Sequence, residues 1–262
     1  MTAAAPAPDD AAVVARLRAA GCVFAEDEAR LLLAEAQSPA RLEALVRRRV
    51  AGEPLEHLLG WAEFCGLRIV VTPGVFVPRR RSELLVHEAA TLAPSGAVVV
   101  DLCCGCGAVA AALTTRLDRP EVHASDVDPA AVACAGRNLP GGSVHAGDLF
   151  DALPTALRGR VDVLVANVPY VPSEAIALMP PEARQHEPRT ALDGGADGLD
   201  VARRLVAGAP EWLAPGGSVL FEIGEEQRSA ATAIVTAAGL VPRVATLEEI
   251  GATVIIGTGP PA

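Results

Sequence analysis

From about residue 96 to the end of the chain, short apolar segments that favour β-strands alternate with segments that favour helices. Alternation of this kind indicates an α/β fold, in which helices cover both faces of a parallel sheet. Ligands of such sheets bind beyond the carboxyl ends of the strands. The predicted strands are 97–102, 121–126, 142–148, 161–167, 217–224, 240–247 and 252–258, and the predicted helices are 107–117, 128–139, 198–213 and 225–238.

The first seventy or so residues have a helical pattern instead. Residues 24–37 carry acids at a predicted helix start, and Ser38 followed by Pro39 predicts the start of another helix. Residues 64–78 are rich in β-branched side chains and contain the turn signal Thr-Pro-Gly, so they predict a hairpin. Residues 1–14 have no basic start and no compact apolar core, and we interpret them as a loose tail rather than a signal peptide.

The charge of the chain limits its partners. All 22 basic residues are arginines, the net charge is −10 and the pI is near 5.0. Because an acidic chain repels phosphate backbones, nucleic-acid binding would need a concentrated basic patch, and the arginine triplets at 47–49 and 79–81 are short. No apolar run reaches the roughly 18 to 20 residues of a membrane span. We expect a cytoplasmic protein that is a monomer or weak dimer, with six cysteine thiols rather than disulfides.

The first predicted strand of the sheet runs into a loop of small residues, Asp-Leu-Cys-Cys-Gly-Cys-Gly at 101–107. A strand that ends in an acid, followed by such a turn and a helix start, is a common way to hold an adenosine cofactor. Gly105 and Gly107 allow the backbone to approach a ligand closely, and the helix start offers free N–H groups. The next two strands also end in acids. Asp126 is placed to take a ribose hydroxyl pair, and Asp148 to accept from an adenine amino group while Phe150 packs on the ring.

The fourth strand ends at the sequence Asn-Val-Pro-Tyr, residues 167–170. An amide or aromatic amine is a poor nucleophile, so an enzyme that methylates it must accept both of its hydrogens and aim its nitrogen at an electrophilic methyl group. The side-chain oxygen of Asn167 and a main-chain carbonyl of the Val168–Pro169 turn are candidate acceptors. The ring of Tyr170 would then lie near a cationic sulfonium.

The cysteines of the loop raise the question of a metal or redox site. Cys103 and Cys106 form a C-x-x-C pair, but no second pair follows, and none of the five histidines pairs with a cysteine or acid at metal-ligand spacing. We therefore predict no metal. The three cysteines at 103, 104 and 106 are interpreted as small, easily buried residues that fill a cofactor turn.

Taken together, these motifs resemble the HemK-type protein-(glutamine-N5) methyltransferases. The resemblance runs from about residue 20 to 257, and its most specific parts are the sequences VTPGVFVPR and EPRTALDGGADGLD. It implies a class I S-adenosylmethionine-dependent methyltransferase, Rossmann-like with a seven-stranded sheet, which methylates a protein glutamine such as that of the Gly-Gly-Gln motif of peptide chain release factors. It also implies an N-terminal helical substrate-recognition domain at 1–60, a hairpin linker at 61–78 and a catalytic domain at 79–262.

The resemblance assigns residues by position. The implied catalytic residues are Asn167, Pro169 and Tyr170. The implied substrate-binding residues are these three together with Val168, Arg79 and Glu83. The implied cofactor-binding residues are Asp101, Cys103, Cys104, Gly105, Cys106, Gly107, Asp126, Val127, Asp148, Phe150 and Asn167.

The chain departs from the family pattern at two places. Val168 replaces the first proline of the usual Asn-Pro-Pro-Tyr, and Arg80, Arg81 and Ser82 stand where a proline, a glutamate and a threonine are usual. The methyl acceptor therefore stays open between a release factor, another protein and a smaller amide. The alternatives are an adenine-N6 methyltransferase acting on RNA or DNA, which the charge disfavours, a small-molecule N-methyltransferase, and a cofactor-binding interaction protein without catalysis.

Overall fold

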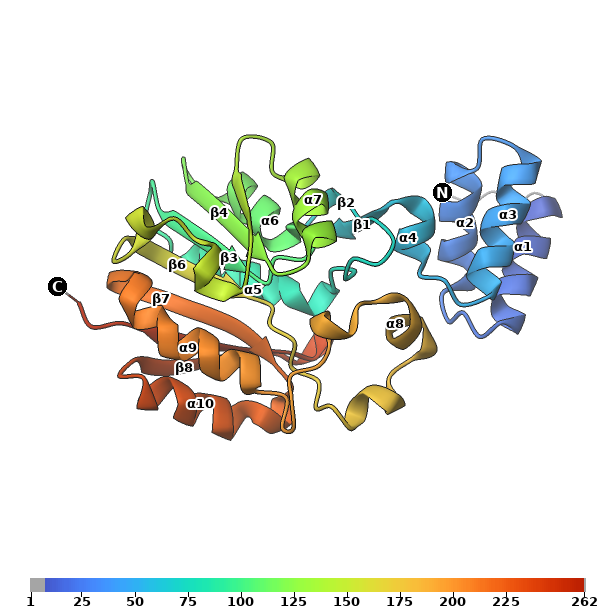
Figure 1. Ribbon diagram of the computed structural model, residues 1–262. Helices are drawn as coiled ribbons and strands as arrows, with labels where there is room; N and C mark the ends of the chain where they lie inside the picture. Colours follow the sequence, from blue (N-terminus) through green and yellow to red (C-terminus); the bar gives the residue numbers. More distant parts are fainter. Residues whose placement is uncertain (1–7, 262) are drawn as a thin grey trace.

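The computed structural model describes residues 8–261, and Figure 1 shows a small helical bundle beside a larger α/β part. The bundle consists of α1 (Pro8–Ala19), α2 (Ala25–Glu35) and α3 (Pro39–Val50), and the short α4 (Leu55–Leu59) leads out of it. Ser38 caps α3 by accepting from the amide of Arg41 at 3.2 Å, as predicted. The prediction of a loose tail is wrong for residues 8–14, which belong to α1; residues 1–7 lie outside the described part.

A hairpin of β1 (Trp61–Phe64) and β2 (Leu67–Val70) connects the two parts. Its turn is at Cys65 and Gly66, which both have positive φ angles of 52° and 77°. This geometry matches a two-residue turn of the kind that suits the twist of a hairpin. Thr-Pro-Gly does form a turn, in which the N–H of Val75 donates to the C=O of Thr72 at 3.1 Å, but it follows β2 and is not the turn of the hairpin. The side chain of Asn138 holds β2 against the α/β part, because it bonds both the N–H and the C=O of Val70 at 2.9 Å.

The seven-stranded sheet has the order β5-β4-β3-β6-β7-β9-β8. Its strands up to β7 pair in parallel, whereas β9 pairs antiparallel with both of its neighbours. The sequence predicted a parallel sheet, and the last pair differs because only residues 248–251 connect β8 to β9, too few for a parallel crossover. The strands are β3 (Val98–Leu102), β4 (Glu121–Asp126), β5 (Ser143–Ala146), β6 (Val161–Ala166), β7 (Leu213–Ile223), β8 (Val241–Leu247) and β9 (Ala252–Thr258).

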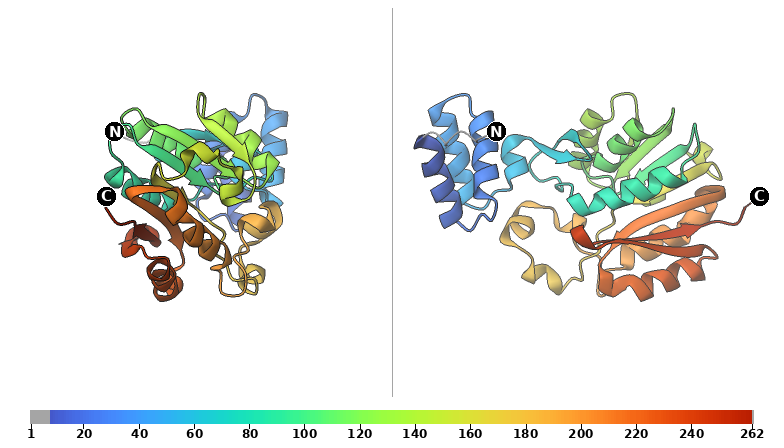
Figure 2. Two further views of the ribbon diagram at one scale, coloured as in Figure 1. Left: turned by 60° about the vertical axis from the view of Figure 1, so that its left-hand side comes forward. Right: turned by 180° about the vertical axis from the view of Figure 1, so that it is seen from behind.

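Helices cover both faces of this sheet, as Figures 1 and 2 show. One face packs against α5 (Glu83–Leu92), α6 (Ala108–Arg116) and α7 (Pro129–Asn138). The other packs against α9 (Asp200–Trp212) and α10 (Arg228–Ala237). The side chains of β6 alternate between the two cores, with Val163 and Val165 in the first and Leu164 and Ala166 in the second. This alternation determines to which face of the sheet each side chain at the carboxyl end of β6 points.

A long irregular segment between β6 and α9 reaches toward the helical bundle (Figure 1). It contains α8 (Pro181–His186) and short 3₁₀ turns at Ala175–Leu178 and Arg189–Ala191. Arg49 of α3, whose side chain is only 10% exposed, contacts Glu28 of the bundle at 2.6 Å and Glu182 of this segment at 3.0 Å. The segment therefore joins the bundle to the α/β part. Within residues 8–261, no helix combines the length and apolarity needed to cross a membrane.

Candidate active site

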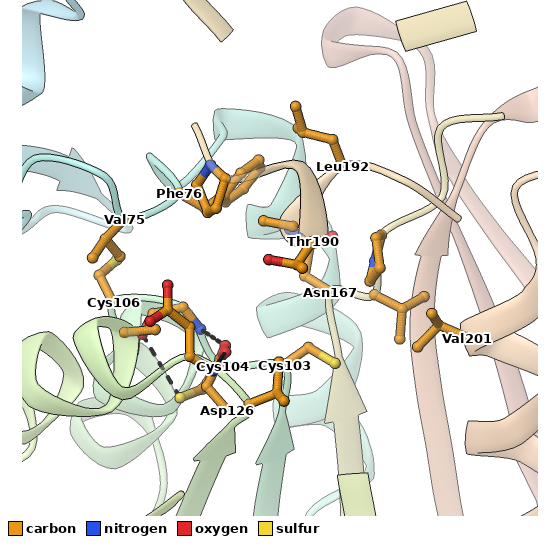
Figure 3. Close-up of a pocket in the computed structure, with 18 of the residues that line it drawn as sticks. Val75, Phe76, Cys103, Cys104, Cys106, Asp126, Asn167, Thr190, Leu192 and Val201 are labelled. Carbon is orange, nitrogen blue, oxygen red and sulfur yellow. Dashed lines mark hydrogen bonds between the residues drawn. The ribbon is translucent and has the colours of Figure 1, made fainter. Parts of the chain in front are cut away.

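A cavity of about 590 Å³ opens at the carboxyl ends of β3, β4 and β6. Figure 3 shows the cysteine loop and Asp126 on one side of it and Asn167 on another, with Thr190 and Leu192 of the irregular segment above. The volume lies within the range of small-molecule sites. The predicted site residues that line it are Arg79, Asp101, Cys103, Cys104, Gly105, Cys106, Asp126, Val127, Asp148, Asn167, Val168, Pro169 and Tyr170.

The loop after β3 has a regular backbone pattern. Cys103, Gly105 and Gly107 all have positive φ angles, of 56°, 54° and 76°. Cys103 therefore occupies a position with a glycine-type backbone, although it is not glycine. At Gly105 a side chain would extend into open space, since the nearest neighbour of an added Cβ is the Cβ of Phe76 at 4.0 Å, whereas at Gly107 it would meet the Cβ of Ala135 at 3.0 Å. Gly107 thus lets α6 approach α7, and Gly105 keeps the cavity open.

The acids of the three strand ends differ in their surroundings. Asp101 is buried and accepts from the amide of Ala110 at 3.0 Å. Asp126 fixes the loop, because its two oxygens accept from the amides of Gly105 and Asp128, each at 2.9 Å. Asp148 is half-exposed and pairs with Arg204 at 2.6 Å. Burial raises the pKa of both Asp101 and Asp126, that of Asp101 to about 7.

The raised pKa of Asp101 predicts a pH-dependent stability difference. The pKa of Asp101 is about 7 in the folded protein and near 3.8 in the unfolded chain. The protonated carboxyl therefore contributes its full stability to the folded state below pH 3.8, and this contribution is lost as the pH rises through about 7. Asp101→Asn removes the titration but keeps an oxygen for Ala110. In urea unfolding, the free energy of unfolding of the variant should rise relative to that of the wild type between about pH 4 and 7. Above about pH 7 the difference should not change further. A difference that is constant over this range would contradict the prediction.

Three of the predicted residues, Phe150, Glu83 and Gly107, do not line the cavity. Phe150 stacks on Trp212 of α9, with ring centroids 5.6 Å apart, and its neighbour Leu149 lines the cavity in its place. Glu83 accepts from the amide of Cys65 at 3.0 Å and so holds the hairpin turn. Gly107 supports the loop from behind. Other residues that line the cavity were not predicted as site residues from the sequence, among them Val75, Phe76, Thr190, Leu192 and Val201.

The loop thiols are held in their neutral form. Burial raises the pKa of Cys103, Cys104 and Cys106, that of Cys106 to about 12. All six cysteines are free. Among residues 8–261 no group of three His, Cys, Asp or Glu side chains is arranged to hold a metal ion.

These pKa values predict slow thiol chemistry, because the thiolate is the reactive species. At pH 8 the folded protein should react slowly with an aromatic disulfide reagent at the three loop cysteines, and all six cysteines should react quickly in urea. Fast labelling of the folded loop, located by peptide mass spectrometry, would contradict this interpretation.

The Asn-Val-Pro-Tyr turn leaves β6 and enters a buried polar cluster. The side-chain nitrogen of Asn167 donates to Ser82 Oγ at 3.2 Å. Ser82 Oγ donates to Glu222 Oε2 at 2.7 Å, and Tyr170 Oη donates to Glu222 Oε1 at 2.8 Å. The guanidinium of Arg81 lies 2.9 Å from Glu222 Oε1 and 5.3 Å from the Tyr170 ring centroid. Burial and the charge of Glu222 raise the pKa of Tyr170, so its hydroxyl is a donor rather than a base.

The block at 187–200 supports this turn from the other side. Val171 N–H donates to Leu192 C=O at 3.0 Å, and Gly194 N–H donates to Val171 C=O at 2.9 Å. A Cβ on Gly194 would lie 2.6 Å from the carbonyl oxygen of Pro169, so only glycine fits there. The side chain of Gln227 donates to the carbonyl of Tyr170 at 2.9 Å. The carbonyls of Tyr170 and Val171 are thus used for structure, while those of Val168 and Pro169 accept no hydrogen bond within the described chain.

Arg79 lines the cavity. It pairs with the buried carboxylate of Glu187 at 2.6 Å, and its guanidinium lies 5.0 Å from the ring centroid of Phe76. Glu187 also accepts from the amide of Val77 at 3.2 Å. A second pocket beside Pro54 and α8 is also lined by Arg79, Arg81 and Met179.

The strand order, with its single antiparallel strand β9, and a ligand-sized cavity at the carboxyl ends define a class I methyltransferase fold. Among solved structures, a methyltransferase from Pyrococcus furiosus has the same fold, with a TM-score of 0.56 at 19% identity over 74% of this chain and 90% of that one. A family model described as "Methyltransferase small domain" matches residues 66–180.

Curated relatives narrow the class to one family. A release factor glutamine methyltransferase of Geobacter sulfurreducens is 43% identical over 189 residues, which cover 71% of this chain and 66% of the relative. One of Cereibacter sphaeroides is 37% identical over 265 residues, which cover 91% of this chain and 92% of the relative. The chain belongs to the release factor glutamine methyltransferase family.

Proposed function

We propose that the cavity binds S-adenosylmethionine and that the chain methylates the side-chain amide of a protein glutamine. The observation that carries the proposal is that the Asn-Val-Pro-Tyr turn and the loop after β3 line one and the same cavity. When bound, the cofactor supplies an electrophilic methyl group on a positively charged sulfur. The residues present fit this cofactor, because Gly105 leaves room beside the loop and Asp126 faces the cavity at the position that suits a ribose diol.

The amide would be held by two oxygens of the turn. The nitrogen of the Asn167 side chain is engaged by Ser82, so its oxygen is the group left to accept an amide hydrogen. The carbonyl of Val168 is the second acceptor that we propose. Two acceptors fix both hydrogens and aim the nitrogen, so most of the catalytic effect comes from orientation. Within residues 8–261 the hydrogen-bond partner of the Asn167 side chain is the hydroxyl of Ser82 rather than a base, in keeping with a nitrogen that becomes acidic only as the methyl group arrives.

We further propose a release factor as the acceptor and the domain at 1–60 as the part that recognises it. Two features support a role for the bundle in protein recognition. It has a hydrophobic core of its own, which includes Leu17, Leu32 and Leu45. Through the contact between Arg49 and Glu182 it also reaches the irregular segment, whose residues Thr190 and Leu192 line the cavity. A small-molecule enzyme needs neither feature.

The test is a comparison of acceptors. The purified chain would be incubated with S-adenosylmethionine labelled in its methyl group and, in separate reactions, with a release factor, an RNA oligonucleotide rich in adenine and free glutamine. We expect label in the release factor alone. Label in the RNA would support the adenine-N6 alternative, label in free glutamine a small-molecule enzyme, and cofactor binding without any transfer an interaction protein.

A further inference from the structure

Glu222 is a buried acid that the proposed chemistry does not use directly. It lies within β7, its residue is 1% exposed, and it is surrounded by side chains of two other segments. Ser82 donates to one of its oxygens, and Tyr170 and Arg81 approach the other, at 2.7, 2.8 and 2.9 Å. All three neighbours are donors. A carboxylate can only accept, so the direction of each of these contacts is fixed.

This arrangement also fixes the direction of the next hydrogen bond. The hydroxyl of Ser82, which is 2% exposed, has a single hydrogen, and Glu222 takes it. Ser82 Oγ is then left with lone pairs only, so it can receive a hydrogen from Asn167 but cannot give one. The partner at 3.2 Å must therefore be the NH₂ group of the Asn167 amide rather than its oxygen.

Packing alone would not choose this orientation. The NH₂ and oxygen ends of an asparagine amide are nearly equal in size, so the two flipped states fill the same space and only hydrogen bonds distinguish them. The flipped amide would turn two hydrogens toward the substrate, which itself needs two acceptors. A wrong orientation would thus block productive binding of the glutamine amide without disturbing the fold.

We propose that Glu222 and Ser82 are positioning residues that set the amide of Asn167 with its oxygen toward the acceptor. Glu222 acts only through Ser82 in this relay, and neither residue touches the reacting atoms. The inference rests on the proposed function, because it assigns a purpose to the Asn167 oxygen. A threonine at position 82 would supply the same hydroxyl.

The test is a double-mutant cycle on methyl transfer to a release factor. In Glu222→Gln, the new NH₂ group can donate to Ser82 Oγ and free the hydroxyl hydrogen for the Asn167 oxygen, which stabilises the flipped amide. We expect kcat to fall about 10- to 100-fold, because one oriented hydrogen bond to the reacting group is lost, with KM for S-adenosylmethionine within about twofold of the wild type. Ser82→Ala should cause a similar fall, and Ser82→Thr should retain activity within about threefold.

The double variant Ser82→Ala/Glu222→Gln distinguishes a relay from two independent effects. If Glu222 acts through Ser82, the double variant should be no slower than Ser82→Ala alone. Losses that multiply would overturn the proposal, as would a Glu222→Gln enzyme as fast as the wild type. If the loss of kcat in Glu222→Gln is instead non-additive with that of Tyr170→Phe, Glu222 acts through Tyr170 and not through Ser82. The KM for S-adenosylmethionine and urea unfolding identify any variant that has lost its fold. If Glu222→Gln is such a variant, the comparison of Ser82→Thr with Ser82→Ala tests the proposal instead.

Failure of the proposed function has a different signature. The wild type would then transfer no methyl group, or Asn167→Ala would remain active. Failure of the relay leaves both of these results as expected and removes only the effect of positions 82 and 222.

Discussion

Replacing Asn167 by alanine is expected to lower kcat for methyl transfer by about 100- to 1000-fold, the size of effect seen when one preorganised group at a reacting centre is removed. The substitution removes the oxygen that would accept a glutamine hydrogen, and it also leaves Ser82 Oγ without its donor. Single-turnover transfer to a release factor measures the effect.

Cofactor binding is the control for this variant. Asn167 and Asp126 lie on different sides of the cavity (Figure 3), so the Kd for S-adenosylmethionine, measured by calorimetry, should stay within about threefold of the wild type. An Asn167→Ala enzyme with normal turnover would show that the assignment of the amide acceptor is wrong. A variant that loses turnover and cofactor binding together would show instead that the cavity has been disturbed.

Replacing Asp126 by alanine is expected to weaken the binding of S-adenosylmethionine by about 100-fold or more. Hydrogen bonds to a charged group contribute about 1.5 to 3 kcal/mol each, and a ribose diol would make two of them. The carboxylate also holds the loop, since it accepts from the amides of Gly105 and Asp128. Loss of both roles at one position makes this the largest expected effect on the cofactor.

Asp126→Asn separates the two roles. The amide keeps one oxygen for a backbone donor but has no charge and only one accepting end, so its Kd should lie between those of the wild type and Asp126→Ala. Thermal unfolding without ligand reports the loop contribution alone. If Asp126→Ala binds S-adenosylmethionine as tightly as the wild type, the cofactor is not held in the proposed orientation.

Much of the fold could be predicted from the sequence because periodicity is local. The predicted strand at 121–126 and the predicted helix starts at Pro39 and Pro129 match the structure. The start of α1 was missed because prolines and alanines in a row suggest a loose chain, although Pro8 followed by two acids also suits a first helical turn. Thr-Pro-Gly drew attention because it is a strong local turn signal, and a turn does form there, but the hairpin reverses at Cys65, a cysteine with a positive φ that its own sequence does not favour.

The candidate site was harder to predict where it depends on contacts between distant segments. Acids that end successive strands meet at one edge of a parallel sheet, so Asp101, Asp126 and Asp148 were identified. Whether Leu149 or Phe150 faces the cavity depends on how Trp212 packs, and nothing in the local sequence fixes that. Glu222 could have been found from the sequence, because it is a single acid within the apolar strand sequence SVLFEIG. A buried strand tolerates a charged side chain only where that side chain has hydrogen-bond or ion-pair partners.

The central claim is that this chain transfers a methyl group to the amide of a protein glutamine. The most direct measurement is tandem mass spectrometry of a release factor after incubation with the chain and S-adenosylmethionine. We expect the glutamine of the Gly-Gly-Gln motif to gain the mass of one methyl group, and Asn167→Ala to leave it unmodified. A release factor that stays unmodified while the chain binds S-adenosylmethionine, or a methyl group on any other residue type, would contradict the claim.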